Sequence, residues 1–264
     1  MKRNYIAQRF QLGGTGLSLD TEALSKYKDI IDLSIGDTDF TTDEAIIAAA
    51  FRDAGLGHTH YGDPKGDPEL ISAVCRAWEE DFGQPLSNDH VLVSTSSCLG
   101  MALTMLAILD PGDEVIVFSP YFAVYRSQIE LAGGVCVDVP TYADENYAID
   151  EARLRAAITP RTKAIIFNNP ANPTGMSYDR DTLSMLARIA QEYDLLIAAD
   201  EIYTTYLYEG DFCPIRTLPG MAERTITLNS FSKNYLMTGW RVGVIIAEPE
   251  LLAVMNRING ALVY

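Results

Sequence analysis

The chain has 264 residues, 48% of them hydrophobic, and a net charge of −16 from 20 Lys and Arg against 36 Asp and Glu. This length suits one large α/β domain, or one domain with a fragment of a second. The acidic balance argues against a surface for nucleic acid or an anionic membrane. No apolar run approaches the length of a membrane span, so no membrane partner is expected.

Cysteine and histidine usage excludes several kinds of site. The four cysteines are scattered without a CxxC pair, which argues against a zinc site and a disulfide framework. The three histidines form no metal-ligand or triad pattern, so we expect no metal and no histidine as the main base. The N-terminus lacks the apolar core of a secretory signal. Reduced thiols and the missing signal together predict a cytoplasmic protein.

The predicted elements alternate along most of the chain. Turn-forming glycines mark the first 30 or so residues as an arm. From about Ala45 onward, short apolar runs alternate with helical patterns, which is typical of a mainly parallel sheet wrapped by helices. The predicted helices cover 44–54, 67–82, 98–109, 121–132, 180–194 and 249–262. The predicted strands cover 90–94, 114–118, 135–139, 163–167, 195–199, 225–229 and 242–246.

The most informative stretch is SFSKNYLMTGWRVG, which follows the strand predicted at 225–229. Its position puts Ser230 and Lys233 beyond the carboxyl end of a strand, where ligands of open α/β sheets bind. A partly desolvated lysine there acts as a nucleophile or imine partner. Ser230 and Arg241 are suited to a phosphate dianion. Taken singly, each charged residue is more often a solvated surface group.

Three other strand ends carry polar residues. Asp200 closes the strand at 195–199, where a buried carboxylate needs a partner such as a protonated ring nitrogen, although a helix N-cap is the alternative. Asn172 lies in the rigid turn NNPANPTG, which also reads as a turn without chemistry. Ser97 and Cys98 lie where a strand gives way to a helix, so their amides suit a phosphate, or simply cap the helix.

Together these stretches resemble the class I/II aminotransferases, the fold-type I pyridoxal-phosphate (PLP) enzymes, and the match runs through most of the chain. The family motifs are SxSK…GWRxG, NNPxNPTG and DExY. The resemblance implies that Lys233 holds the cofactor as an internal aldimine and that Asp200 pairs with its ring nitrogen. It implies that Asn172 and Tyr203 bind the phenolate oxygen.

The resemblance also assigns the rest of the site. Ser230 and Arg241 would hold the phosphate with the backbone amides of Ser97 and Cys98. Softer matches place Gly36 against the substrate carboxylate and Phe122 on the pyridine ring. They also place Tyr61 on the phosphate of a neighbouring subunit, which implies a homodimer. Ser96 departs from the family, which usually has glycine there, and this could tighten or tilt the turn.

The resemblance predicts a three-layer α/β/α domain with a mostly parallel seven-stranded sheet whose last strand is antiparallel. Residues 1–44 would form an N-terminal arm and part of a small domain, and residues 45–264 the PLP-binding large domain. Family members usually continue for over a hundred residues past this point, so we expect the C-terminal small domain, with its carboxylate-binding arginine, to be absent.

The expected function is amino transfer from an L-amino acid to a 2-oxo acid, with catalytic roles for Lys233, Asp200 and Tyr203. The alternatives are a PLP-dependent C–S lyase or another PLP reaction on the same fold, a non-catalytic sensor domain, and a truncated chain that binds cofactor without turnover. Tyr203 favours a transaminase, because lyase relatives tend to carry histidine there. No basic helix-turn-helix segment precedes residue 30, which argues against the sensor, and no strand precedes a GxGxxG, which excludes a dinucleotide-binding dehydrogenase.

Overall fold

The computed structural model describes residues 5, 29, 31 and 36–263. The chain divides into two units, residues 1–37 and 38–264, and the elements below all belong to the second. The glycines on which the predicted N-terminal arm rests lie outside the described residues. The predicted division at residues 44 and 45 stays a prediction.

A seven-stranded sheet forms the centre of residues 38–263, in the order β1-β7-β6-β5-β4-β2-β3. β7 is antiparallel to both of its neighbours, and the other pairs are parallel. The predicted strands and the antiparallel last strand are therefore confirmed. The strands are β1 (Val91–Ser94), β2 (Glu114–Ser119), β3 (Val135–Pro140), β4 (Thr162–Asn168), β5 (Leu196–Asp200), β6 (Thr225–Ser230) and β7 (Gly243–Ile246).

All six predicted helices form, and two further α-helices appear among the described residues. Helix α5 begins three residues later than predicted, so Tyr121 and Phe122 lie in the loop before it. The two helices that the sequence did not predict are α6, with a single buried residue, and the one-turn α8. The helices are α2 (Glu44–Gly55), α3 (Pro68–Phe82), α4 (Ser97–Ile108), α5 (Val124–Leu131), α6 (Glu151–Ala157), α7 (Arg180–Glu192), α8 (Phe231–Asn234) and α9 (Pro249–Val263).

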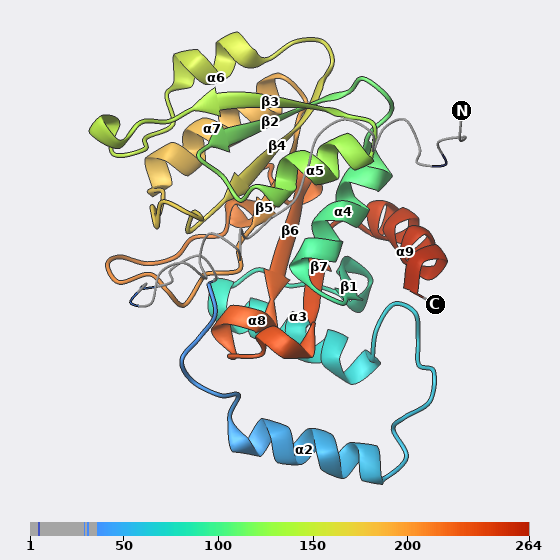
Figure 1. Cartoon of the computed structure of the whole chain (residues 1–264). Coiled ribbons are helices and arrows are strands. Elements are labelled where there is room, and N and C mark those ends of the chain that lie inside the picture. Colours follow the sequence, from blue (N-terminus) through green and yellow to red (C-terminus); the bar gives the residue numbers. More distant parts are fainter. Residues whose placement is uncertain (1–4, 6–28, 30, 32–35, 264) are drawn as a thin grey trace. The chain divides into compact units, whose positions relative to one another are not determined.

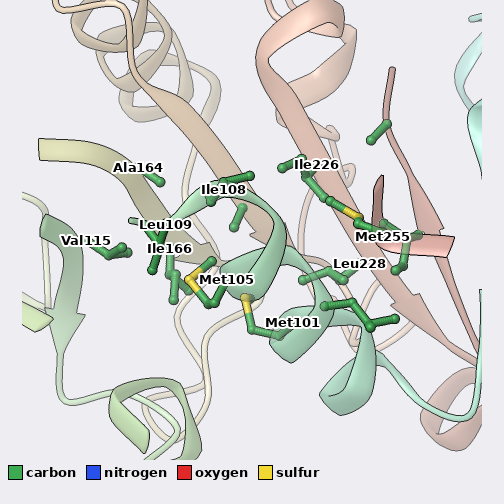
Figure 2. Packing of buried hydrophobic residues seen from close by; sticks show 14 of the residues in the cluster. Met101, Met105, Ile108, Leu109, Val115, Ala164, Ile166, Ile226, Leu228 and Met255 are labelled. Atoms are coloured by element: carbon green, nitrogen blue, oxygen red, sulfur yellow. The ribbon is translucent and has the colours of Figure 1, made fainter. Parts of the chain in front are cut away.

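Helices cover both faces of the sheet, which confirms the three-layer α/β/α class (Figure 1). Helices α4, α5 and α9 pack on one face, and α3, α6 and α7 pack on the other. Figure 2 shows Met101, Met105 and Ile108 of α4 among apolar side chains of the strands.

Alternation along the central strands explains why both faces are covered. In β4, Ile166 belongs to the cluster under α4, while Ile165 and Phe167 belong to the cluster under α7. Such strands read as continuous apolar runs because neither face meets water. The predicted apolar face of α7 is confirmed, since Leu183, Leu186, Ala187 and Ala190 are all buried. Within the described part of the chain, no helix is both long enough and apolar enough to cross a bilayer.

Candidate functional site

Four strands end and a fifth begins at one edge of the sheet. Asn168 and Asp200, the last residues of β4 and β5, are paired in register. Ser230 ends β6 and lies opposite Gly243, which begins the antiparallel β7 and also faces Ser94 of β1. Ligands of open α/β sheets bind at such carboxyl ends. The predicted residues Asp200 and Ser230 are therefore brought to one edge.

Asp200 is a buried carboxylate, and only one of its two oxygens accepts a hydrogen bond from the described residues. Its side chain is 6% exposed, and its Oδ2 accepts a 2.5 Å hydrogen bond from the hydroxyl of Tyr125. Its Oδ1 is buried and has no hydrogen-bond partner among the described residues. Burial raises the pKa of Asp200 to about 6, and the bond from Tyr125 opposes that rise. An unsatisfied buried carboxylate oxygen is costly, so this atom is suited to a cationic N–H donor.

Tyr125 is a member of this site that the sequence did not reveal. It lies in α5, is almost completely buried, and its ring meets Phe122 edge-on at 5.6 Å between centroids. Burial first, and then the charge of Asp200, hold the pKa of Tyr125 well above 10. The hydroxyl therefore keeps its proton and remains a donor. A tyrosine at a buried aromatic position is the one sequence signal, because a buried hydroxyl needs a partner.

Asn172 and Tyr203 converge beside Asp200. The Nδ2 of Asn172 lies 3.4 Å from the hydroxyl oxygen of Tyr203, to which it donates. Asn168 links the backbone of Asn172 to that of Asp200. Its Oδ1 accepts from the Asn172 backbone amide at 2.6 Å, and its Nδ2 donates to the Asp200 carbonyl at 2.8 Å. Burial, and then the charge of Asp200, raise the pKa of Tyr203, while Asn172 lowers it. Two donors thus stand side by side next to the carboxylate.

The N-terminus of α4 forms the predicted cup of backbone amides. Ser97 and Cys98 occupy the first turn, where helix N–H groups lack an intrahelical acceptor. Ser96 is the N-cap, with an extended φ of 172° and a hydroxyl that accepts from Leu99 N at 3.1 Å. Gly243 packs against this turn so closely that a Cβ there would lie 2.5 Å from Ser97 N.

Ser230 and Arg241 flank the same turn. The hydroxyl of Ser230 caps α8 by accepting from Ser232 N at 3.1 Å, and lies 3.3 Å from the carbonyl of Val242, to which it donates. Arg241 has the left-handed φ of 59° and donates to the Thr238 carbonyl at 2.8 Å. Its charge lowers the pKa of the Cys98 thiol, although burial, and the charge of Asp200 after it, raise that pKa overall. Arg241 therefore acts electrostatically on the cup.

Lys233 lies in α8, half-buried, directly after the end of β6. This helix is tied to the loop that carries Tyr203. The hydroxyl of Tyr206 donates to the Lys233 carbonyl at 3.2 Å, and the amide of Asn234 donates to the Thr204 hydroxyl at 2.7 Å. The lysine is thus carried on a turn that is fixed to the rest of the site.

Two other predicted residues are described within this unit. Phe122 is half-buried and rests on Tyr125. Tyr61 is 89% exposed in the single chain. Gly36 belongs to the other unit of the chain. Among the described residues, no group of three or more His, Cys, Asp or Glu is arranged to hold a metal ion.

The residues present fit the cofactor that the sequence implies. The spare oxygen of Asp200 suits a protonated ring nitrogen, and the α4 turn beside Arg241 suits a phosphate. A small pocket nearby in the fold is lined in part by Tyr125, Asn168 and Asn172. The chemistry of these residues is consistent with PLP.

Comparison with known proteins finds similarity to aminotransferases. An aspartate/prephenate aminotransferase of Thermus thermophilus is 40% identical over 88% of this chain and 60% of its own length. An arginine–pyruvate transaminase of Pseudomonas aeruginosa is 35% identical over 96% of this chain and 65% of its own length. The solved aspartate aminotransferase of Thermus thermophilus with maleate superposes with a TM-score of 0.92, at 35% identity, over 98% of this chain and 69% of that one.

The chain thus spans about three fifths of the length of the curated relatives it matches. The family model for aminotransferase class I and II matches residues 28–264. The chain belongs to the class I and II aminotransferase family.

Proposed function

We propose that this protein transfers an amino group from an L-amino acid to a 2-oxo acid, with Lys233 as the covalent attachment point for PLP. The observation that carries the proposal is the buried carboxylate of Asp200, which presents an unsatisfied oxygen beside the Asn172–Tyr203 pair. A ring that is protonated at nitrogen and anionic at a neighbouring oxygen satisfies both groups at once.

Class I and II aminotransferases use PLP, which supplies an aldehyde and a protonated ring that accepts electrons from the substrate. In the proposal, Asp200 holds the ring N–H, and Asn172 and Tyr203 donate to the phenolate oxygen. Lys233 would carry the proton that leaves and returns to the substrate Cα.

The other residues bind and orient. The hydroxyl of Ser230, the guanidinium of Arg241 and the backbone amides of Ser97 and Cys98 would hold the phosphate. Phe122 would cover one face of the ring, and Gly36 would lie against the substrate carboxylate. Holding the reacting atoms in this way is worth several kcal/mol of barrier.

The substrate proposal stays at the level of a class. The names of the two curated relatives span aspartate, prephenate, arginine and pyruvate. Because these substrates differ in charge and size, we propose only an L-amino acid donor and a 2-oxo acid acceptor. We also propose a homodimer in the cytoplasm; the four cysteines, all free, are consistent with a reducing compartment.

The decisive experiment reduces the protein with borohydride after incubation with PLP and maps the labelled peptide. The wild type should carry the label at Lys233, and its absorbance band should change when amino acids from a panel are added. Lys233→Ala should lose both signals but still bind PLP through its phosphate.

Lys163→Ala is the matched control, because Lys163 pairs with Asp113 at 3.2 Å in the structure and should leave labelling unchanged. A label on another lysine would refute the attachment point. Release of ammonia and pyruvate from cysteine, without amino transfer, would instead identify a C–S lyase.

A further inference from the structure

One aromatic side chain that the proposed chemistry does not use is hydrogen-bonded to Asp200. Tyr125 donates its hydroxyl to Oδ2 of Asp200 at 2.5 Å, across 75 residues of sequence. Tyr125 is only 2% exposed, so water does not compete for this hydrogen bond. With Oδ2 fixed, the direction of the spare Oδ1 is fixed as well.

The same side chain supports the loop before α5. The Tyr125 amide donates to the Phe122 carbonyl at 3.0 Å, and the two rings meet edge-on at 5.6 Å with an angle of 83°. Aromatic pairs in this arrangement attract each other beyond their burial. The position of the Phe122 ring therefore depends on where the Tyr125 ring lies.

We propose that Tyr125 is a positioning residue for two groups that contact the cofactor ring. Its hydroxyl orients the Asp200 carboxylate, and its ring orients Phe122. The inference rests on the proposed function, because it takes Asp200 and Phe122 as the ring contacts. It adds a residue to the site and gives its hydroxyl a specific task, which is to keep Asp200 ionised.

The electrostatics agree with this geometry. Burial raises the pKa of Asp200, and the hydrogen bond from Tyr125 lowers it, because the bond stabilises the ionised carboxylate. Other titratable groups that interact with Asp200 are Cys98 from α4, Tyr203 from the loop after β5, and the neighbouring Glu201. Without the Tyr125 hydroxyl, the proton shared with a ring nitrogen should shift toward the carboxyl.

The first test uses Tyr125→Phe without cofactor. Carbon NMR of labelled aspartate carboxyls should show the pKa of Asp200 rising by about one unit, since loss of a hydrogen bond to a charged group is worth that much. The control is Tyr178→Phe, which removes a hydroxyl that donates to the Tyr147 carbonyl at 3.4 Å and should leave the Asp200 titration unchanged. An identical Asp200 titration in Tyr125→Phe and the wild type would overturn the inference.

The second test uses the protein loaded with PLP that is labelled with 15N at the ring. In Tyr125→Phe the nitrogen signal should move toward the unprotonated position, and PLP should dissociate about tenfold more readily. Tyr125→Leu, which also removes the ring beside Phe122, should bind PLP more weakly still. If Tyr125→Phe and Tyr125→Leu bind PLP equally tightly, the Tyr125 ring does not position Phe122.

A third variant guards against misfolding. Difluorotyrosine at position 125 keeps the shape but makes the hydroxyl a stronger donor, so the pKa of Asp200 should fall below the wild-type value. A wild type that binds no PLP would refute the proposed function, whereas the cofactor-free titrations would still test Tyr125. A wild type that binds PLP normally, with Tyr125 variants unchanged, would refute only this inference.

Discussion

At the scale of single residues, the end of β5 holds two adjacent carboxyl groups in different environments. Asp200 accepts from a hydroxyl, whereas Glu201 is 1% exposed and accepts only the Ile215 amide, at 3.2 Å, among the described residues. Burial first, and then the charge of Asp200, raise the pKa of Glu201 to about 8, although the Ile215 amide and Arg216 lower it. Glu201 is therefore mostly protonated at neutral pH, so it does not compete with Asp200 for a cation.

The protonation of Glu201 predicts a dependence of stability on pH. The pKa of Glu201 is about 8 in the folded protein against 4.5 for an ordinary glutamate, so the folded protein keeps a proton that the unfolded chain releases. This contribution is complete below pH 4.5 and is lost as the pH rises through 8. Glu201→Gln should remove that loss, making the variant more stable at pH 9 by on the order of a few kcal/mol.

Urea unfolding of Glu201→Gln between pH 5 and 9 measures this difference. Glu250→Gln, at an exposed position in the first turn of α9, is the control and should follow the wild type. Parallel curves for the wild type and Glu201→Gln across that range would mean that Glu201 is already ionised in the folded protein.

At the scale of elements, the amide cup depends on how closely β7 approaches the start of α4. A Cβ on Gly243 would lie 2.5 Å from Ser97 N and 2.6 Å from the Ser96 carbonyl carbon, and backbone atoms cannot move aside as a side chain can. Gly243→Ala should therefore push the first turn of α4 away from β7. We expect a loss of about 1–3 kcal/mol in unfolding free energy and weaker binding of PLP.

Gly239→Ala is the matched control, because Gly239 lies in the turn shortly before β7 and a Cβ there meets nothing within 4 Å. Thermal unfolding and a PLP titration compare the two variants. If Gly243→Ala binds PLP as tightly as Gly239→Ala does, the close packing of β7 does not shape the cup.

The same elements show what the sequence could predict. Continuous apolar runs located every strand because both faces of the sheet are covered. The strand ends then indicated Asp200, Asn172 and Ser230. Helix α6 was not predicted because it buries only Leu154 and so shows no apolar periodicity. Helix α8 was not predicted because it is a single turn. Short elements leave too few residues for a pattern.

The sequence did not indicate Tyr125 as a site residue for a different reason. An aromatic residue three positions after Phe122 is consistent with ordinary core packing, and Tyr125 does belong to the apolar cluster under α4. Only the fold brings its hydroxyl to Asp200, 75 residues away in sequence. Contacts between distant segments depend on topology, which local patterns do not encode.

At the scale of the whole molecule, helix α2 stands out because none of its residues is buried in the single chain. Phe51 in α2 and Leu56 just beyond it are 74% and 72% exposed, and Tyr61 follows at 89%. Exposed apolar groups this close together are typical of an interaction surface. They support the proposal that a second copy covers this segment and that Tyr61 reaches the neighbouring phosphate.

Light scattering on the PLP-loaded protein should therefore give the mass of a dimer, as expected for the commonest closed symmetry. Tyr61→Phe should keep that mass but bind PLP several-fold more weakly, because one hydrogen bond to a charged phosphate is lost. Tyr208→Phe changes an equally exposed tyrosine, at 92%, and should bind PLP as the wild type does. A monomer that binds PLP fully would contradict both the dimer and the role of Tyr61, whereas a dimer with unchanged affinity in Tyr61→Phe would contradict the role of Tyr61 alone.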